Sequence, residues 1–138
     1  MSNGLPAPTG TGTMPRMTAR TLAGLQAAGR VLLGGGVAAA PSLLAGGWVG
    51  DVAEKPGGRV LATGLGGRDV ALALGTFAAL RDGRGARRWV LAGMVADTAD
   101  LVATLRARDS LSPVAVPVVA AIAGGSVLLG AWLSRELD

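Results

Sequence analysis

The sequence predicts an all-α protein, an integral membrane four-helix bundle with a disordered N-terminal tail. The first observation is composition, since half of the 138 residues are hydrophobic. The second is a set of apolar stretches, the longest of which can cross about 30 Å of hydrocarbon as helices. The third is that a few charged residues lie near the middles of these stretches, where each needs a partner. We therefore divide the chain into a tail, residues 1–17, and one helical domain, residues 18–138.

The composition also limits the chemistry open to this chain. The sequence contains no histidine, cysteine or tyrosine. Their absence removes thiolate and imidazole chemistry, disulfides, haem ligation by histidine and the usual zinc ligands, so we expect no cofactor and no metal site. Basic residues exceed acidic ones, 13 to 9, but one Phe and three Trp offer few rings for stacking on bases. We therefore expect no nucleic-acid partner.

The first predicted span covers about residues 20–41. The tail before it is rich in proline, glycine and threonine and has little apolar surface to bury, which is typical of disordered segments. Pro41 and a later pair of glycines indicate a break and then a loop. Arg30 lies about 15 Å into this span, at 1.5 Å per residue. A span over residues 31–50, with Arg30 at its boundary, stays open as an alternative.

A cleavable signal peptide is another interpretation of the first apolar stretch. Arg16 and Arg20 precede the apolar residues, and three alanines at 38–40 end them. Pro41 follows those alanines directly and disfavours cleavage, because proline leaves the scissile bond without its normal amide nitrogen. We therefore expect the segment to be retained as a span.

The second predicted span covers about residues 60–80. Its only charged residues are Arg68 and Asp69, which point about 100° apart on a helix and so cannot both face one neighbour. Small residues at a spacing of four also form a ridge on this helix, which permits close contact between helices. The members of this ridge are Gly67, Ala71 and Gly75.

The third predicted span covers about residues 89–105 and contains Asp97 and Asp100. Because these two aspartates are three residues apart, they share one face of a helix. Each costs about 3 kcal/mol near the bilayer centre, which outweighs most of the gain from the apolar residues around it. We therefore expect this span to insert only together with its neighbours.

The fourth predicted span, about residues 114–134, has no charged residue and reaches across a bilayer. A soluble bundle is disfavoured because this stretch lacks a polar outer stripe. Basic residues place both termini of a multi-pass inner-membrane protein in the cytoplasm. Seven lie in the tail, the turn at 81–88 and the C-terminus, against four in the other two connections. Three tryptophans fall near predicted span ends, as interfacial anchors do: Trp48, Trp89 and Trp132.

The charged residues inside the spans form a predicted intramembrane polar cluster of Arg30, Arg68, Asp69, Asp97 and Asp100. One interpretation is structural, because two arginines facing three aspartates come close to charge balance and fix how helices pack. The functional interpretations are a proton-carrying site or a general acid at Asp97 or Asp100. The pattern leaves open which Asp pairs with which Arg, and it assigns no catalytic residue.

One segment carries a resemblance to a known family. Residues 66–75, Gly-Gly-Arg-Asp-Val-Ala-Leu-Ala-Leu-Gly, are followed by Arg88-Trp89 and the two aspartates of the third span. This arrangement resembles the small four-span bacterial membrane proteins of the DUF4267 family over about residues 20–134. The resemblance implies four membrane helices with a shared intramembrane cluster of one Arg and three Asp, and it implies no named reaction. The layout is also similar to DoxX-like four-helix membrane proteins, some of which are linked to quinone or redox partners.

Three functional hypotheses follow from these features. The leading one is a non-enzymatic membrane protein, either an accessory subunit or a bundle that binds lipid or a small ligand. The second is a membrane-embedded isomerase or cyclase on an isoprenoid-like substrate, which requires a lipid-accessible cavity beside an Asp general acid. The third is proton-coupled transport by an oligomer. The expected partners are membrane lipid, a lipid-soluble small molecule, and further copies of the chain or a partner membrane protein.

Overall fold

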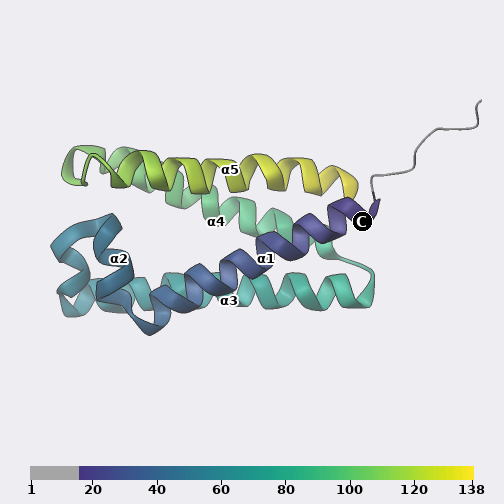
Figure 1. The fold of residues 1–138 in the computed structure, drawn as a ribbon, viewed down its shortest axis with the longest axis horizontal. Coiled ribbons are helices and arrows are strands. Elements are labelled where there is room, and N and C mark those ends of the chain that lie inside the picture. The colour runs from purple at the N-terminus through teal and green to yellow at the C-terminus, as the bar shows by residue number, and fades with distance from the viewer. Residues whose placement is uncertain (1–15) are drawn as a thin grey trace, which may run out of the picture.

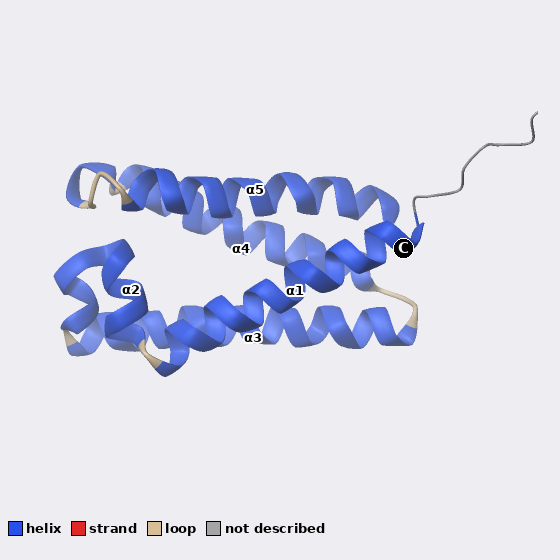
Figure 2. Cartoon of the chain, viewed as in Figure 1, coloured by secondary structure: helices blue, strands red, loops and turns tan. Residues whose placement is uncertain are grey.

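The protein is predominantly helical in the part that the computed structural model describes, residues 16–138, and no strand occurs there (Figures 1 and 2). This confirms the all-α prediction. The predicted disordered tail lies outside the described residues at 1–15, and its last two residues already belong to the first helix. The elements are α1 (Arg16–Ala39), α2 (Pro41–Val49), η1 (Gly50–Glu54), α3 (Pro56–Asp82), α4 (Ala86–Arg106), η2 (Arg108–Ser110) and α5 (Ala115–Glu136).

Four long helices lie lengthwise beside one another, and short α2 lies at one end of them (Figure 1). α1 packs chiefly against α3, and α4 chiefly against α5, so the molecule consists of two helix pairs. The start of α1, the α3–α4 turn and the C-terminus share the other end. There, the Arg20 guanidinium donates to the Leu80 carbonyl, and the Arg87 N–H donates to the Asp138 carbonyl over 3.3 Å.

The predicted loop after Pro41 is wrong, because α2 and η1 continue in helical form to residue 54. Pro41 occupies the first turn of α2, where its fixed φ suits a helix and its missing N–H leaves no donor unpaired. The two helices follow one another with hydrogen bonds from the Ala40 N–H to the Gly36 carbonyl and from the Leu44 N–H to the Ala40 carbonyl. The break predicted at this point is therefore a kink between two helices. As a result, the described chain has five α-helices where four were predicted.

Local sequence signals account for the ends of α3 and the start of α4. Pro56 stands in the first turn of α3. Gly83 ends this helix with φ of 75°, and Gly85 precedes α4 with φ of 78°. This left-handed backbone is accessible to glycine at little cost. The tight turn between these helices is thus built on two glycines.

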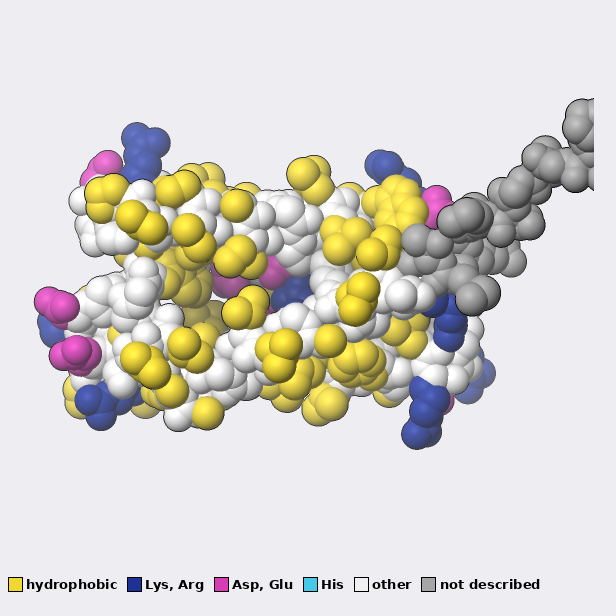
Figure 3. All heavy atoms as spheres, viewed as in Figure 1, with side chains coloured by type: hydrophobic (Ala, Val, Ile, Leu, Met, Phe, Trp, Pro, Cys, Tyr) yellow, Lys and Arg dark blue, Asp and Glu magenta, His cyan; other side chains and the backbone are white. Residues whose placement is uncertain are grey.

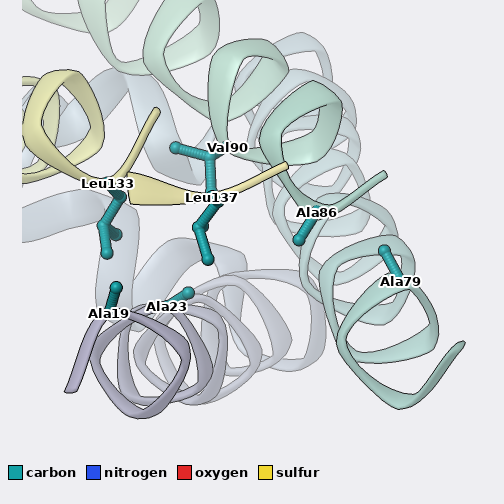
Figure 4. Packing of buried hydrophobic residues seen from close by; sticks show 7 residues of the cluster. All are labelled: Ala19, Ala23, Ala79, Ala86, Val90, Leu133 and Leu137. Carbon is teal, nitrogen blue, oxygen red and sulfur yellow. The ribbon is translucent and has the colours of Figure 1, made fainter. Parts of the chain in front are cut away.

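Alanine dominates the interior. Among residues 19–138, twelve of the fifteen buried hydrophobic residues are alanines, so the helices approach closely over small side chains. One apolar cluster closes the end that holds the C-terminus, with Leu133 packed between α1 and α4 (Figure 4). A smaller cluster of Ala45, Ala53 and Ala62 lies at the α2 end. Between these two clusters, the middle of the bundle holds buried alanines such as Ala27 and Ala73 together with charged residues.

Large apolar side chains point outward along the whole length of the bundle (Figure 3). In the described part of the chain, two helical segments, residues 19–39 and 115–136, are long and apolar enough to cross a membrane. In the most apolar window of each, 17% of the residues are buried. Over residues 19–138, seven large apolar residues are at least 70% exposed: Leu32, Leu43, Val60, Leu61, Val95, Val114 and Leu128. In the described chain, the apolar side chains in the interior are therefore mostly small, and those on the surface are large.

Candidate functional site

Arg30 projects from α1 into the middle of the bundle and bridges two carboxylates. Its Nη2 lies 2.5 Å from Oδ2 of Asp97 on α4, and its Nη1 lies 3.3 Å from Oδ1 of Asp69 on α3. The side chains of Arg30 and Asp97 are 11% and 10% exposed. This arginine therefore joins three helices through charge-assisted hydrogen bonds.

Arg68, on α3, makes the second bridge. Nη1 and Nη2 donate to the two carboxylate oxygens of Asp100 over 3.1 and 2.7 Å, in the two-pronged geometry that favours arginine over lysine. Nε and Nη2 also donate to Oδ1 of the adjacent Asp69, over 3.2 and 3.0 Å. Asp69 therefore accepts hydrogen bonds from both arginines.

The five predicted cluster residues thus form one continuous chain of ion pairs, which we call the Arg–Asp network. Its order is Asp97, Arg30, Asp69, Arg68, Asp100. It contains two cations and three anions, contributed by α1, α3 and α4. The two aspartates of α4 share a helix face, as their spacing predicts, but each binds a different arginine. The network therefore crosses between the two helix pairs.

Glycines make room for the network. A Cβ on Gly93, one turn before Asp97, would lie 2.8 Å from Nη2 of Arg30. A Cβ on Gly66 would lie 2.3 Å from the Gly34 carbonyl oxygen and 2.6 Å from the Ala38 nitrogen, which marks a close crossing of α1 and α3. This crossing lies within one turn of Arg30 and Arg68. The backbone contact thus sets the separation that the ion pairs bridge.

The predicted small-residue ridge of α3 does not make this crossing. Gly67 and Ala71 are exposed, and nothing lies within 4 Å of a Cβ added to Gly67. Gly75 does serve a close contact, because a Cβ there would meet the Trp89 ring at 2.4 Å. The contact face is one residue away from the predicted ridge, at Gly66, since the helix rotates about 100° per residue.

Two further polar contacts were not predicted from the sequence. The Trp48 Nε1–H on α2 donates to Oγ1 of buried Thr104 on α4 over 3.2 Å, and the indole is partly exposed. The Gln26 amide on α1 donates to Oγ of Ser126 on α5 over 2.8 Å. The Gln26–Ser126 contact links the two helix pairs, and the Trp48–Thr104 contact ties α2 to α4. Single polar residues on an apolar helix were the only signal available for them.

The network is reachable from one side of the bundle. Figure 3 reveals charged side chains in a hollow midway along the molecule, between α5 and α1. Arg68, Asp69 and Asp100 are 30, 23 and 20% exposed, whereas Arg30 and Asp97 are nearly closed off. Two cavities of about 450 Å³ lie at the ends of the bundle, and neither is lined by a network residue. Nothing in residues 16–138 gathers three or more acidic side chains into a candidate metal site.

The arrangement is suited to holding helices together. Each network aspartate accepts hydrogen bonds from a guanidinium group, so the oxygens facing the arginines act as acceptors. Comparison of the chain with protein families, with curated proteins and with solved structures finds no match.

Proposed function

We propose that this chain is an integral membrane protein in which α1, α3, α4 and α5 span the bilayer and the Arg–Asp network fastens the two helix pairs together. Its role would be that of an accessory subunit or a bundle that binds lipid or a small ligand. The observation that carries the proposal is the inverted distribution of side chains, with alanine inside and large apolar residues outside.

This distribution fits a lipid environment and is costly in water. Burying a leucine or valine side chain is worth about 1.5–3 kcal/mol, yet many of those on the long helices stay uncovered. In a bilayer they contact acyl chains, and small residues between helices give the close backbone packing on which membrane bundles rely. Charged residues outside the network gather at the two ends of the molecule (Figure 3).

The position of the network supports the same proposal. A charge near the bilayer centre costs about 2.5–3.5 kcal/mol on insertion scales, and such residues usually face the bundle interior and pair with one another. Arg30 pairs with Asp69 and Asp97, and Arg68 pairs with Asp69 and Asp100. The four-span layout and the Gly-x-Arg-Asp segment also support membership of a family like DUF4267, with an inner-membrane location and cytoplasmic termini.

The isomerase hypothesis has less support. It requires a cavity beside a carboxyl group that donates a proton, whereas Asp97 lies behind Arg30 and Asp100 is bound by both prongs of Arg68. The side chains of Arg68 and Asp100 are 30 and 20% exposed, so a ligand would reach the network more easily at this pair than at Arg30 and Asp97. We therefore place ligand binding, if it accompanies the structural role, at Arg68 and Asp100.

Cysteine labelling in intact membranes tests the proposal, because the chain has no cysteine of its own. Leu32→Cys and Val95→Cys replace side chains that are 76 and 71% exposed, so a water-soluble maleimide would reach them in a soluble protein. We expect neither to react in membranes. Glu54→Cys should react only from the outer side, and Arg84→Cys only from the cytoplasmic side.

Two results would contradict the proposal. One is recovery of the protein in the soluble fraction with Leu32→Cys and Val95→Cys labelled as fully as Glu54→Cys. The other is labelling of Glu54→Cys and Arg84→Cys from the same side, because α3, the long helix between these two residues, would then not cross the membrane. Denaturing the sample in detergent provides the control, because every cysteine should then react.

A further inference from the structure

We infer that the end of the bundle formed by the α3–α4 turn binds the headgroups of anionic phospholipids; this inference rests on the proposed membrane location. Arg81, Arg84, Arg87 and Arg88 lie within eight residues there, with Asp82 as the single acid among them. All four arginines are exposed. Arg135 on α5 adds a further exposed cation at the same end. We call these five arginines the arginine-rich end.

Most of these arginines are free of internal partners. The side chains of Arg84, Arg87, Arg88 and Arg135 take part in none of the ion pairs found among residues 16–138. Arg81 lies 3.6 Å from Asp82, but both side chains are largely exposed, so this pair contributes little. The guanidinium groups are therefore available for phosphate oxygens, which they bind in two-pronged geometry.

The opposite end of the bundle has a different charge pattern. Its connections carry four basic residues, Lys55, Arg59, Arg106 and Arg108, against three acidic ones, Asp51, Glu54 and Asp109. The arginine-rich end carries its five arginines and Arg20 against Asp82, Glu136 and Asp138, so its excess of positive charge is larger. Figure 3 shows dark blue and magenta side chains mixed at that end, whereas dark blue predominates at the other. A preference for anionic lipid should therefore be confined to one leaflet.

Two tryptophans place the arginine-rich end at the headgroup level. Trp89 follows Arg88 directly, and its ring lies over Gly75, where no side chain blocks it. Trp132 lies one turn before Glu136 on α5. These indoles are 40 and 38% exposed, as amphipathic rings at a membrane interface are. Lipid phosphates at this depth would meet the arginines, whose long side chains reach outward.

A membrane leaflet suits this surface better than a free anion does. The arginines are spread over the ends of α3, α4 and α5 and do not converge on one point, so they match a layer of headgroups more than a single phosphate. Each arginine near an anionic surface contributes about 1 kcal/mol, which corresponds to about a fivefold preference over a zwitterionic lipid.

Tryptophan quenching in vesicles tests this inference. The full chain in a Trp48→Phe background would be reconstituted with brominated phosphatidylglycerol or with brominated phosphatidylcholine, so that Trp89 and Trp132 report the lipid beside them. We expect stronger quenching by the anionic lipid at equal bromine content. The triple variant Arg84→Gln, Arg87→Gln, Arg88→Gln should lose most of this preference, and high salt should reduce it.

A matched triple variant at the other end, Lys55→Gln, Arg106→Gln, Arg108→Gln, is the control and should keep the preference. Equal quenching by the two lipids in the unsubstituted background, or equal losses in both triple variants, would overturn the inference. Loss of the preference on adding millimolar inorganic phosphate at constant ionic strength would also overturn it, in favour of a free-anion site. If neither brominated lipid quenches at all, the proposed membrane location fails instead.

Discussion

The guanidinium of Arg30 lies against the backbone of Gly93 and from there reaches Asp97, one turn further along α4. A side chain at position 93 would occupy the place of Nη2, since an added Cβ would lie 2.8 Å from it. Arg30 also holds Asp69, so one arginine connects α1 with α3 and α4. The absence of a side chain at Gly93 is therefore a condition for the most buried ion pair of the network.

Replacing this glycine should destabilise the bundle. In Gly93→Ala the added methyl group must displace a guanidinium that two aspartates hold, and overpacking of this kind costs about 1–3 kcal/mol. The matched control is Gly124→Ala on α5, where nothing lies within 4 Å of the added Cβ. That change should be neutral or stabilise by about 0.5–1 kcal/mol, because alanine favours the helix. Thermal unfolding in detergent measures both, and equal melting temperatures would refute the prediction.

Arg30 and Asp97 should behave as a coupled pair. Removing one partner of a buried ion pair leaves the other charge uncompensated, which costs about 3–5 kcal/mol. We expect Arg30→Gln and Asp97→Asn each to lower stability by this order. The double variant should be more stable than the sum of the single effects predicts, and a double-mutant cycle gives the coupling. Additive losses would mean that the two residues do not stabilise one another in the membrane.

The close crossing of α1 and α3 predicts a contrast between neighbouring glycines. Gly66→Ala would place a methyl group 2.3 Å from the Gly34 carbonyl oxygen, and backbone atoms cannot turn away as a side chain can. We expect the free energy of unfolding to fall by about 1–3 kcal/mol or more, because the helices move apart and the ion pairs between them weaken. Gly67→Ala, one residue further on, meets open space and should cause no loss. Thermal unfolding in detergent measures both variants. A larger loss of stability in Gly67→Ala than in Gly66→Ala would mean that the predicted ridge, and not Gly66, makes the helix contact.

The Trp48–Thr104 hydrogen bond gives a prediction for α2. Trp48→Phe keeps a smaller aromatic ring but loses the N–H that donates to Thr104. Loss of this hydrogen bond should lower the stability by about 0.5–1.5 kcal/mol. Trp132→Phe is the comparison, because no hydrogen bond of its indole occurs in the described structure. We expect a lower melting temperature for Trp48→Phe than for Trp132→Phe. The reverse order would mean that α2 does not dock on α4 through this tryptophan.

Much of the fold was predictable because it depends on local signals. Apolar stretches, the glycines of the 83–85 turn and Pro56 predict helices at nearly the observed places, with ends shifted by a few residues. The α2 segment was missed because a proline and paired glycines usually indicate a loop, whereas here Pro41 begins a helix. Its Trp48–Thr104 contact was missed for the same reason, since the side on which a short helix docks depends on distant residues.

The sequence by itself determined that this chain forms apolar helices with charged residues near their middles, because hydropathy and helix-forming bonds act within a few residues. It also identified the five residues that the structure joins, since they are charged residues inside otherwise apolar stretches. Only the tertiary structure decided which charges pair. Arg30 takes Asp97 and Arg68 takes Asp100 because the Gly34–Gly66 crossing sets how α1 and α3 are rotated and spaced. That rotation depends on contacts between helices far apart in the chain, which no local pattern specifies.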